Sequence, residues 1–232
     1  MRVDTYESLS GQVALVTGAT RGIGEQTARI LAEHDATVYA GARDPDDVTA
    51  GDRRPLELDV TDDAETRAAL DRVEEEAGRL DILVNNAGVR GPTEPLHEAP
   101  VEGIDETLSV NLRGAMVLTK YALSLLLERE GGRVVNLSSG LGTLGAGMDG
   151  GSPPYRVSKT GLNGLTAYLH GEYGGEGLLA NAARPGWVRT DLATPGAPRS
   201  PAEGADTPAW LARFEPGAPA GRCWRDRTPV GW

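Results

Sequence analysis

Short apolar runs alternate with segments of helical spacing along most of the chain. Several of these runs are almost continuously apolar, which is typical of strands that are covered on both faces of a sheet. Their alternation with helical patterns predicts βαβ units and a parallel sheet. The expected strands are residues 13–17, 37–42, 54–59, 82–85, 133–138, 178–183 and 222–224.

Helices are expected between these strands. After Gly22, side chains from Ile23 onwards recur at i, i+4, i+7 and i+8, which places them on one helical face toward a sheet. Two longer helices are expected near residues 106–127 and 155–170. A further helix should start at Ser200, because the sequence Ser-Pro-Ala-Glu combines a capping serine with proline at the first and glutamate at the third helical position.

A chain of 232 residues fits one large α/β domain better than two small ones, and neither internal repeats nor a linker divide it. Residues 1–10 are expected to form an N-terminal extension, and residues 190–232 a substrate loop, a helix and the last strand. Residues 44–54 must carry the whole crossover between the second and third strands, so the helix there should be very short. We therefore predict a single Rossmann-type α/β domain over residues 1–232, with a doubly wound parallel sheet of about seven strands and helices on both faces.

Composition excludes several classes of function. The formal net charge of −11 opposes general binding of nucleic acid, because a phosphate backbone would be repelled. The longest apolar runs, such as residues 122–127, are far too short to cross a bilayer, and the N-terminus has no apolar signal core. The single cysteine, Cys223, excludes an intrachain disulfide, and three scattered histidines form no ligand cluster. We expect a cytoplasmic enzyme that binds no metal, nucleic acid or membrane.

Lysine is nearly absent from the chain. Of the 23 basic residues, 21 are arginine, and only Lys120 and Lys159 are lysine. An acidic, lysine-poor composition is typical both of a high-salt cytoplasm and of a GC-rich genome, and both origins stay open. The scarcity of surface lysine gives weight to Lys159 as a functional residue.

A glycine turn lies between the first expected strand and the helix that follows it. Gly18, Gly22 and Gly24 have the spacing G-x-x-x-G-x-G rather than G-x-G-x-x-G. Glycine permits a tight turn and lets backbone N–H groups approach a pyrophosphate, while the helix N-terminus adds the positive end of its dipole. A merely tight loop is the alternative, but the position after a strand and before a helix favours a dinucleotide site.

Two arginines bear on which dinucleotide is bound. Many NAD-binding folds carry an acidic residue at the end of the second strand, whereas this strand ends in Arg43 and Arg21 lies inside the glycine turn. Two guanidinium groups would suit a 2′-phosphate, so we predict NADP(H) as the cofactor. In the alternative interpretation, Arg43 is solvated or pairs with Asp44 or Asp46.

Tyr155 and Lys159 lie four residues apart, on one face of an expected helix. A tyrosine is a poor acid at neutral pH, and a nearby ammonium group would lower its pKa toward the working range. Ser138 and Ser139 end the fifth expected strand, where a hydroxyl can hold a substrate oxygen. Asn111 lies in an otherwise apolar helix and is either a satisfied structural amide or part of the site.

In their order along the chain, these motifs resemble the short-chain dehydrogenase/reductase family from about Gly11 onwards. The part from Asn181 is most similar to monomeric carbonyl reductases. The motifs that carry the resemblance are Thr17-Gly-x-x-x-Gly-Ile-Gly24, Asn85-Asn-Ala-Gly88, Asn111, Ser138-Ser139 and Tyr155-x-x-x-Lys159.

The resemblance implies a catalytic group of Ser139, Tyr155, Lys159 and Asn111. Ser139 would polarise a carbonyl oxygen, Tyr155 would protonate it, Lys159 would bind the nicotinamide ribose and lower the tyrosine pKa, and Asn111 would anchor a water. The cofactor-binding residues implied are Gly18, Thr20, Arg21, Gly22, Ile23, Gly24, Arg43, Asp59, Val60, Asn86, Ala87, Gly88, Tyr155, Lys159, Pro185, Gly186, Val188 and Thr190.

The sequence therefore predicts an NADPH-dependent reductase of a ketone, aldehyde or quinone, reversible toward the alcohol. Its substrate pocket should be formed by residues 89–96, 140–154 and 190–192. The alternative is a non-catalytic protein that senses the dinucleotide, although such proteins usually lose the tyrosine or the lysine. Monomeric carbonyl reductases carry a long insertion before the tyrosine that is missing here, so the long helices are expected to pair in a homodimer or homotetramer.

Overall fold

Eight strands form one sheet in the order β3-β2-β1-β4-β5-β6-β7-β8. The structure is a computed structural model and describes residues 3–49, 51–193 and 196–232. The predicted doubly wound α/β fold is confirmed, and each of the seven expected strands is present within two residues of its predicted ends. The parallel strands are β1 (Val13–Thr17), β2 (Thr37–Ala42), β3 (Arg53–Glu57), β4 (Ile82–Asn85), β5 (Arg133–Leu137), β6 (Leu179–Ala183) and β7 (Arg222–Arg225).

The eighth strand, β8 (Thr228–Val230), was not predicted. It pairs antiparallel with β7 through a two-residue turn at Asp226 and Arg227, whose φ angles are +49° and +56°. Two left-handed residues match the twist of a hairpin, but such turns usually contain glycine or asparagine. The turn therefore left no signal in the sequence.

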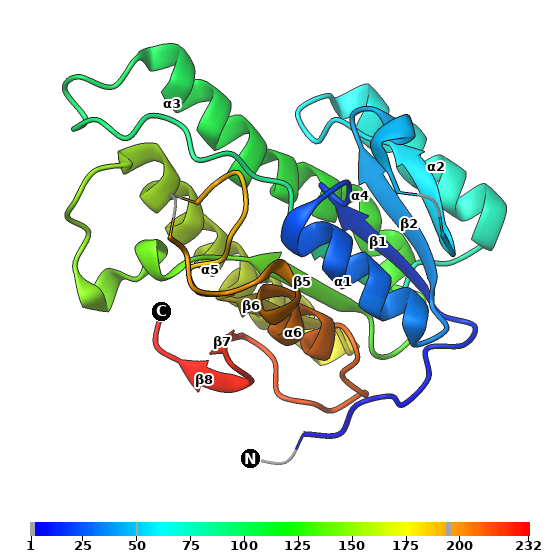
Figure 1. Cartoon of the computed structure of the whole chain (residues 1–232). Coiled ribbons are helices and arrows are strands. Elements are labelled where there is room, and N and C mark those ends of the chain that lie inside the picture. The colour runs from blue at the N-terminus through cyan, green and yellow to red at the C-terminus, as the bar shows by residue number, and fades with distance from the viewer. Residues whose placement is uncertain (1–2, 50, 194–195) are drawn as a thin grey trace.

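Helices cover both faces of the sheet (Figure 1). The helices are α1 (Gly22–Glu33), α2 (Asp63–Ala77), α3 (Val101–Leu108), α4 (Ala115–Leu127), α5 (Pro153–Tyr173) and α6 (Pro201–Leu211). The side chains of β1 alternate between two cores: Ala14 and Val16 lie in the core with α1 and α6, whereas Val13 and Leu15 lie in the core with α2, α4 and α5. Because β1 is buried on both faces, these four consecutive side chains are all apolar, although they alternate between the two cores.

Helices α3 and α4 are joined by a π-helical turn, Ser109–Gly114, and together form one helical segment. By length and composition alone this segment, Val101–Leu127, could span a bilayer, with a mean hydropathy of 1.2 in its best window, although its apolar runs, such as residues 122–127, are short. Nevertheless, α4 buries Leu118, Ala122 and Leu125 in the core under the sheet. A core helix of this kind passes the same test of length and hydropathy.

Two predictions about shorter segments are also confirmed. The described part of the crossover between β2 and β3 contains one 3-10 turn, Pro45–Asp47, which Asp44 caps by accepting a hydrogen bond from the Asp46 N–H at 3.0 Å. Helix α6 begins after Ser200 with the expected capping box, in which Ser200 and Glu203 bond reciprocally.

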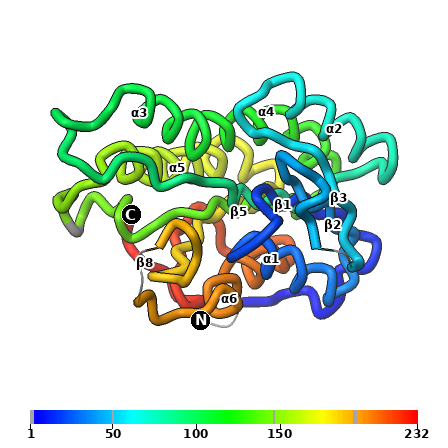
Figure 2. Tube along the Cα trace, turned by 45° about the horizontal axis from the view of Figure 1, so that its top comes forward, coloured from blue at the N-terminus to red at the C-terminus, as the bar shows by residue number. Residues whose placement is uncertain are grey.

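Residues 3–10 pack against the rest of the chain and pass beside α6 (Figure 2). Thr5 forms an isolated bridge with Phe214, and the Tyr6 N–H donates to the Arg213 carbonyl at 2.8 Å. The Arg213 guanidinium in turn donates to the Tyr6 carbonyl, and Leu9 is fully buried. The expected N-terminal extension therefore closes one side of the α1–α6 core.

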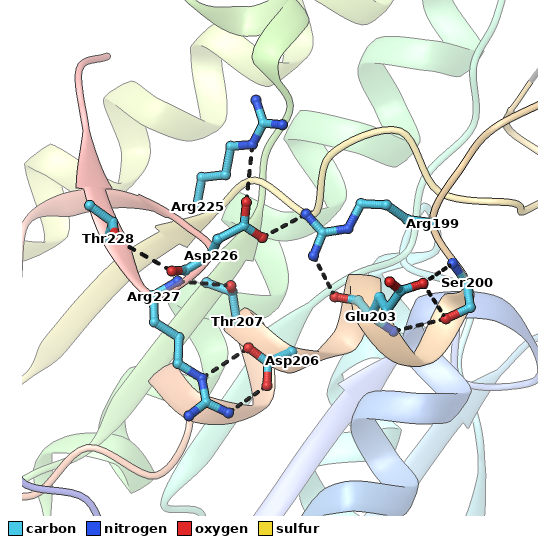
Figure 3. Close-up of polar contacts among 9 residues, drawn as sticks. All are labelled: Arg199, Ser200, Glu203, Asp206, Thr207, Arg225, Asp226, Arg227 and Thr228. Carbon is cyan, nitrogen blue, oxygen red and sulfur yellow. Dashed lines mark hydrogen bonds and ion pairs between the residues drawn. The ribbon is translucent and has the colours of Figure 1, made fainter.

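Ion pairs join the β7–β8 turn to α6 and to the residues just before it (Figure 3). Arg199 contacts Asp226 at 2.6 Å, and the Arg227 guanidinium forms a two-point contact with Asp206. The Arg227 N–H also donates to Thr207 Oγ1 at 3.3 Å. Exposed pairs of this kind contribute about 0–1 kcal/mol each, but together they hold the left-handed turn against the helix.

Candidate active site

A cavity of about 650 Å³ lies at the carboxyl ends of the central strands, where the strand order changes direction between β1 and β4. In open α/β sheets this switch point is where ligands bind. Most of the predicted cofactor residues line it. These residues are Gly18, Thr20, Arg21, Gly22, Ile23, Gly24, Arg43, Asp59, Val60, Asn86, Ala87, Gly88 and Thr190.

The cavity also has lining residues that were not predicted to touch a cofactor. Most of them are immediate neighbours of predicted ones, and Asp191 and Leu192 had been assigned to the substrate pocket. Glu106 and Val110 come from the long helical segment, and no local motif marks them. The full set is Ala42, Asp44, Asp47, Leu58, Thr61, Glu106, Val110, Arg189, Asp191, Leu192 and Pro201.

Five predicted cofactor residues do not line this cavity: Tyr155, Lys159, Pro185, Gly186 and Val188. Val188 is only 4% exposed, and a methyl group added at Gly204 would lie 2.8 Å from its Cγ2, so its side chain packs against α6. The roles assigned to these five toward the cofactor stay predictions.

The glycine turn is held by the end of β4. Nδ2 of Asn86 donates to the carbonyl oxygens of Thr17 and Gly18 at 2.8 and 3.0 Å, and Thr17 Oγ1 accepts from the Asn86 N–H at 3.0 Å. A Cβ at Gly24 would lie 2.2 Å from the Gly18 oxygen, and Gly18 itself has φ +62°. Glycine is therefore required at both positions, and no described side chain caps the N-terminus of α1, whose N–H groups face the turn.

The two arginines of the cofactor prediction have different surroundings. Arg43 lines the cavity and forms no ion pair with Asp44 or Asp46 within 4.0 Å. Arg21 is paired with Asp191, with Nε 2.6 Å from Oδ2, and both side chains are 72% exposed. This surface pair joins the glycine turn to the loop after β6.

Asp59 lies at the other end of the cavity, after β3. Its Oδ1 accepts hydrogen bonds from the N–H and the hydroxyl of Thr61, at 2.8 and 2.7 Å. Its own N–H donates to Glu65 at 2.8 Å. The carboxylate thus shapes the turn that leads into α2 while lining the cavity.

Tyr155 and Lys159 lie on one face of α5, as predicted, with Nζ of Lys159 5.6 Å from the centre of the tyrosine ring. Nζ donates a hydrogen bond of 2.7 Å to the Leu137 carbonyl at the end of β5. Burial lowers the pKa of Lys159 to about 8, because desolvation disfavours the ammonium form. A methyl group added at Gly88 would lie 3.7 Å from this nitrogen, so Lys159 adjoins the dinucleotide cavity.

The pKa of Tyr155 lies above its ordinary value, not below it as the sequence led us to expect. Desolvation by burial is the largest cause and raises the pKa. A hydrogen bond with Ser139 and the charge of Arg90 act in the opposite direction and are outweighed. Burial thus keeps the phenol protonated, which suits a proton donor.

The two adjacent serines have different partners. The Ser138 hydroxyl is buried and donates to Oδ1 of Asn163 at 2.6 Å. Ser139 Oγ accepts from the Leu141 N–H at 3.2 Å and is the hydroxyl that contacts Tyr155. The geometry therefore places Ser139, and not Ser138, beside the tyrosine.

Asn111 lies in the π-helical turn and is 1% exposed. Its Oδ1 accepts from the Val89 N–H at 2.8 Å, and Nδ2 donates to the Val89 carbonyl at 2.8 Å and to Ser158 Oγ at 3.2 Å. The amide is satisfied by protein groups and joins the segment after β4 to α5. Its expected role in holding a water stays a prediction.

Comparison with known proteins agrees with this geometry. The sequence model of the family described as short chain dehydrogenase matches residues 12–199. The chain is 38% identical over 218 residues to the cis-4-hydroxycyclohexanecarboxylate dehydrogenase of Sinomonas cyclohexanicum, which covers 90% of this chain and 84% of the relative. It is 33% identical over 191 residues to the 3-oxoacyl-(acyl-carrier-protein) reductase of Escherichia coli (strain K12), which covers 80% of this chain and 77% of the relative.

Solved structures share the whole fold. The aldohexose dehydrogenase of Thermoplasma acidophilum superposes with a TM-score of 0.85 at 25% identity, over 95% of this chain and 94% of that chain. A short-chain type dehydrogenase/reductase of Mycobacterium marinum gives a TM-score of 0.85 at 26% identity, over 94% of each chain. The similarity extends beyond the cavity to the arrangement of the complete sheet.

Proposed function

The chain belongs to the short-chain dehydrogenase/reductase family, and on that premise we propose that it is an NADPH-dependent reductase of a ketone, aldehyde or quinone. The observation that carries the proposal is the grouping of Ser139, Tyr155 and Lys159 next to a dinucleotide-sized cavity. In the reverse direction the same groups would oxidise a secondary alcohol.

The residues of the cavity fit a nicotinamide dinucleotide. The glycine turn has no side chain where a Cβ at Gly24 would collide with the Gly18 oxygen, and the N-terminus of α1 opens beside it. These features suit a pyrophosphate, with Asp59 at the adenosine end and Gly88 toward Lys159. When bound there, the nicotinamide supplies the hydride.

The protein's own groups would handle the proton and the carbonyl oxygen. Ser139 would donate a hydrogen bond to that oxygen and polarise it, and Tyr155 would deliver its proton as negative charge develops there. Lys159, whose ammonium group lies behind the ring, would stabilise the resulting phenolate. Partial burial of Tyr155 raises its pKa and so keeps the proton available for this transfer.

Preference for NADPH over NADH rests on Arg43 and Arg21. Arg43 extends from the end of β2, where an acidic residue would repel a 2′-phosphate. The Arg21–Asp191 pair is exposed and contributes about 0–1 kcal/mol, so a doubly charged phosphate can compete for the guanidinium.

We also propose a homodimer or homotetramer in the cytoplasm. Met116 on α4 and Val157 and Tyr168 on α5 are large apolar side chains that are at least 49% exposed. Helix faces of this kind are buried when two copies associate. Light scattering at micromolar concentration tests the proposal, and a monomer would contradict it.

The function is tested by NADPH oxidation, in low and high salt, with a panel of carbonyl compounds. One relative is named for a hydroxycyclohexanecarboxylate, so the panel includes 4-oxocyclohexanecarboxylate and its methyl ester beside an aldehyde and a quinone. We expect turnover that Tyr155→Phe lowers at least about 100-fold while NADPH binding is kept. Equal turnover by Tyr155→Phe would overturn the mechanism, and tight NADPH binding without turnover would favour the non-catalytic sensor.

Cofactor preference is measured separately. We expect kcat/KM to be at least about tenfold higher with NADPH than with NADH, and Arg43→Ala to remove most of that difference. A preference for NADH would overturn the NADPH assignment but leave the reductase assignment intact.

A further inference from the structure

Arg90 brings a positive charge to the reacting end of the site, and the mechanism above does not use it. It lies two residues after Gly88, between β4 and α3. Its charge acts on Tyr155, where it lowers the pKa against the effect of burial. Among the residues that the structure describes, no carboxylate lies within 4.0 Å of its guanidinium nitrogens.

The backbone that carries Arg90 is fixed relative to Tyr155. Asn111 binds both polar groups of Val89, at 2.8 Å each. A few residues further on, the Thr93 carbonyl accepts from the Ser152 N–H at 3.2 Å, directly before α5 begins. The segment 89–93 therefore runs against the start of the helix that carries Tyr155.

The side chain of Arg90 extends to the loop after β6. Its Nη1 donates to the Leu192 carbonyl at 3.3 Å, and Leu192 lines the dinucleotide cavity. A guanidinium has five N–H donors, and this bond uses one of them. Arg90 is thus held near Tyr155 and Leu192. Its remaining N–H donors can bind a planar acceptor with two oxygens, such as a carboxylate.

In the part of the chain that the structure describes, no carboxylate pairs with Arg90. In the three segments expected to form the substrate pocket (residues 89–96, 140–154 and 190–192), Arg90 is the only basic residue. Asp191, which precedes Leu192 in the loop after β6, is engaged with Arg21 at 2.6 Å. In a chain with net charge −11, a cation without a carboxylate partner at the reacting end favours an anionic substrate.

Resting on the proposed function, we propose that Arg90 binds a carboxylate of the substrate, so that the enzyme reduces oxo acids in preference to neutral carbonyl compounds. Tyr155 and Ser139 would engage the carbonyl oxygen while Arg90 holds the acid group. The contact is made equally in the ground state and the transition state, so it acts mainly on KM. A charge-assisted contact of this kind changes affinity by about 10- to 100-fold.

The test compares 4-oxocyclohexanecarboxylate with its methyl ester, which keeps the carbonyl group and removes the charge. We expect the wild-type enzyme to prefer the acid by at least about tenfold in kcat/KM, mostly through KM. Arg90→Met should abolish this preference, because the acid loses its charged partner and the ester does not. Arg90→Lys should keep part of the preference, because lysine retains the charge but lacks the paired N–H donors of the guanidinium group. Glu102→Gln, at an exposed position on α3 outside these segments, should leave the preference unchanged and serves as the control.

Two results would overturn the inference. Equal kcat/KM for acid and ester in the wild type would show that no group recognises the carboxylate. An equal loss for both substrates in Arg90→Met would show that the arginine only holds the loop at Leu192. In either case, ester turnover that Tyr155→Phe abolishes would leave the proposed function standing, whereas no NADPH oxidation with any carbonyl compound would reject both.

Discussion

Asn111 binds both main-chain polar groups of Val89, accepting from its N–H and donating to its carbonyl at 2.8 Å each. The same amide donates to Ser158 at 3.2 Å. One buried side chain therefore joins the π-helical turn, the segment before Arg90 and the helix that carries Tyr155. A π turn widens the helix by one residue, and such turns are often found at functional sites.

Asn111→Leu should destabilise the protein and disturb the site together. It leaves the N–H and the carbonyl of Val89 without partners in a partly buried position, which costs about 2 kcal/mol of the free energy of unfolding. It also releases the segment before Arg90, so kcat should fall. Urea unfolding and steady-state kinetics measure the two effects.

Two further variants sharpen this prediction. Asn111→Asp keeps the acceptor for the Val89 N–H but loses the donor, so its stability should lie between the wild type and Asn111→Leu. Ser109→Ala changes the same π turn without touching Val89 and should be neutral. A fully stable and active Asn111→Leu would show that the amide positions nothing.

Gly24→Ala should damage the cofactor site by steric overlap. The added methyl group would lie 2.2 Å from the Gly18 oxygen and 2.3 Å from Nδ2 of Asn86, and both belong to the tight junction of β1, β4 and α1. We expect a loss of about 3 kcal/mol in the free energy of unfolding and at least about a tenfold loss of NADPH affinity. Urea unfolding and fluorescence titration with NADPH measure them.

Gly164→Ala is the matched control for that change. Gly164 also lies in a helix, α5, but a methyl group there meets no atom within 4 Å. Alanine lowers the entropy of the unfolded chain and should raise stability by about 0.5–1 kcal/mol, with NADPH binding unchanged. If both variants behaved alike, the close packing at Gly24 would not be what makes glycine necessary.

The sheet could be predicted because its central strands, such as β1 and β4, are buried on both faces and leave almost continuously apolar runs in the sequence. Helix α2 was not among the helices named, although Thr66, Ala69, Leu70 and Val73 form its buried stripe. Many charged residues lie between these buried positions, so the apolar spacing typical of a core-facing helix is hard to recognise in the sequence. Strand β8 was missed for a different reason, because its turn is stabilised by ion pairs to Arg199 and to α6 that depend on tertiary structure.

The candidate site was predictable where backbone geometry restricts the residue type, as at Gly18 and Gly24. It was not predictable where the outcome depends on burial. The sequence places Lys159 one helical turn from Tyr155, which led us to expect a lowered tyrosine pKa, but desolvation of the phenol outweighs every favourable charge. The position of Arg90 near Tyr155 likewise depends on the hydrogen bonds between Asn111 and Val89, and Asn111 is distant from Arg90 along the chain.

Alanine variants of the two adjacent serines should differ, one affecting mainly stability and the other mainly catalysis. Ser139→Ala removes the hydroxyl beside Tyr155, so kcat should fall by about 100-fold with little change in the free energy of unfolding. Ser138→Ala removes a buried donor to Asn163 and should cost about 1–2 kcal/mol of stability while kcat is largely kept. Kinetics and urea unfolding of the two variants provide the comparison, and the reverse pattern would exchange the roles of the two hydroxyls.

Lys159 should make stability depend on pH in the alkaline range. Its pKa is about 8 in the folded state against an ordinary value of 10.5. Below pH 8 both the folded and the unfolded state carry the proton, and burial of the Lys159 ammonium group lowers the stability of the folded state by on the order of 3 kcal/mol. Between pH 8 and 10.5 the unfolded state alone holds the proton, so stability attributable to this group rises with pH.

Lys159→Met isolates this contribution, because it removes the charge and keeps most of the side-chain volume. At pH 7 the variant should be more stable than the wild type by about 2 kcal/mol, since loss of the hydrogen bond to Leu137 offsets about 1 kcal/mol of the gain. By about pH 10.5 the difference should vanish or reverse. Lys120→Met, at the only other lysine and on the surface, should show no such trend. A difference between Lys159→Met and the wild type that stays constant from neutral to alkaline pH would mean that the ammonium group is solvated rather than buried behind Tyr155.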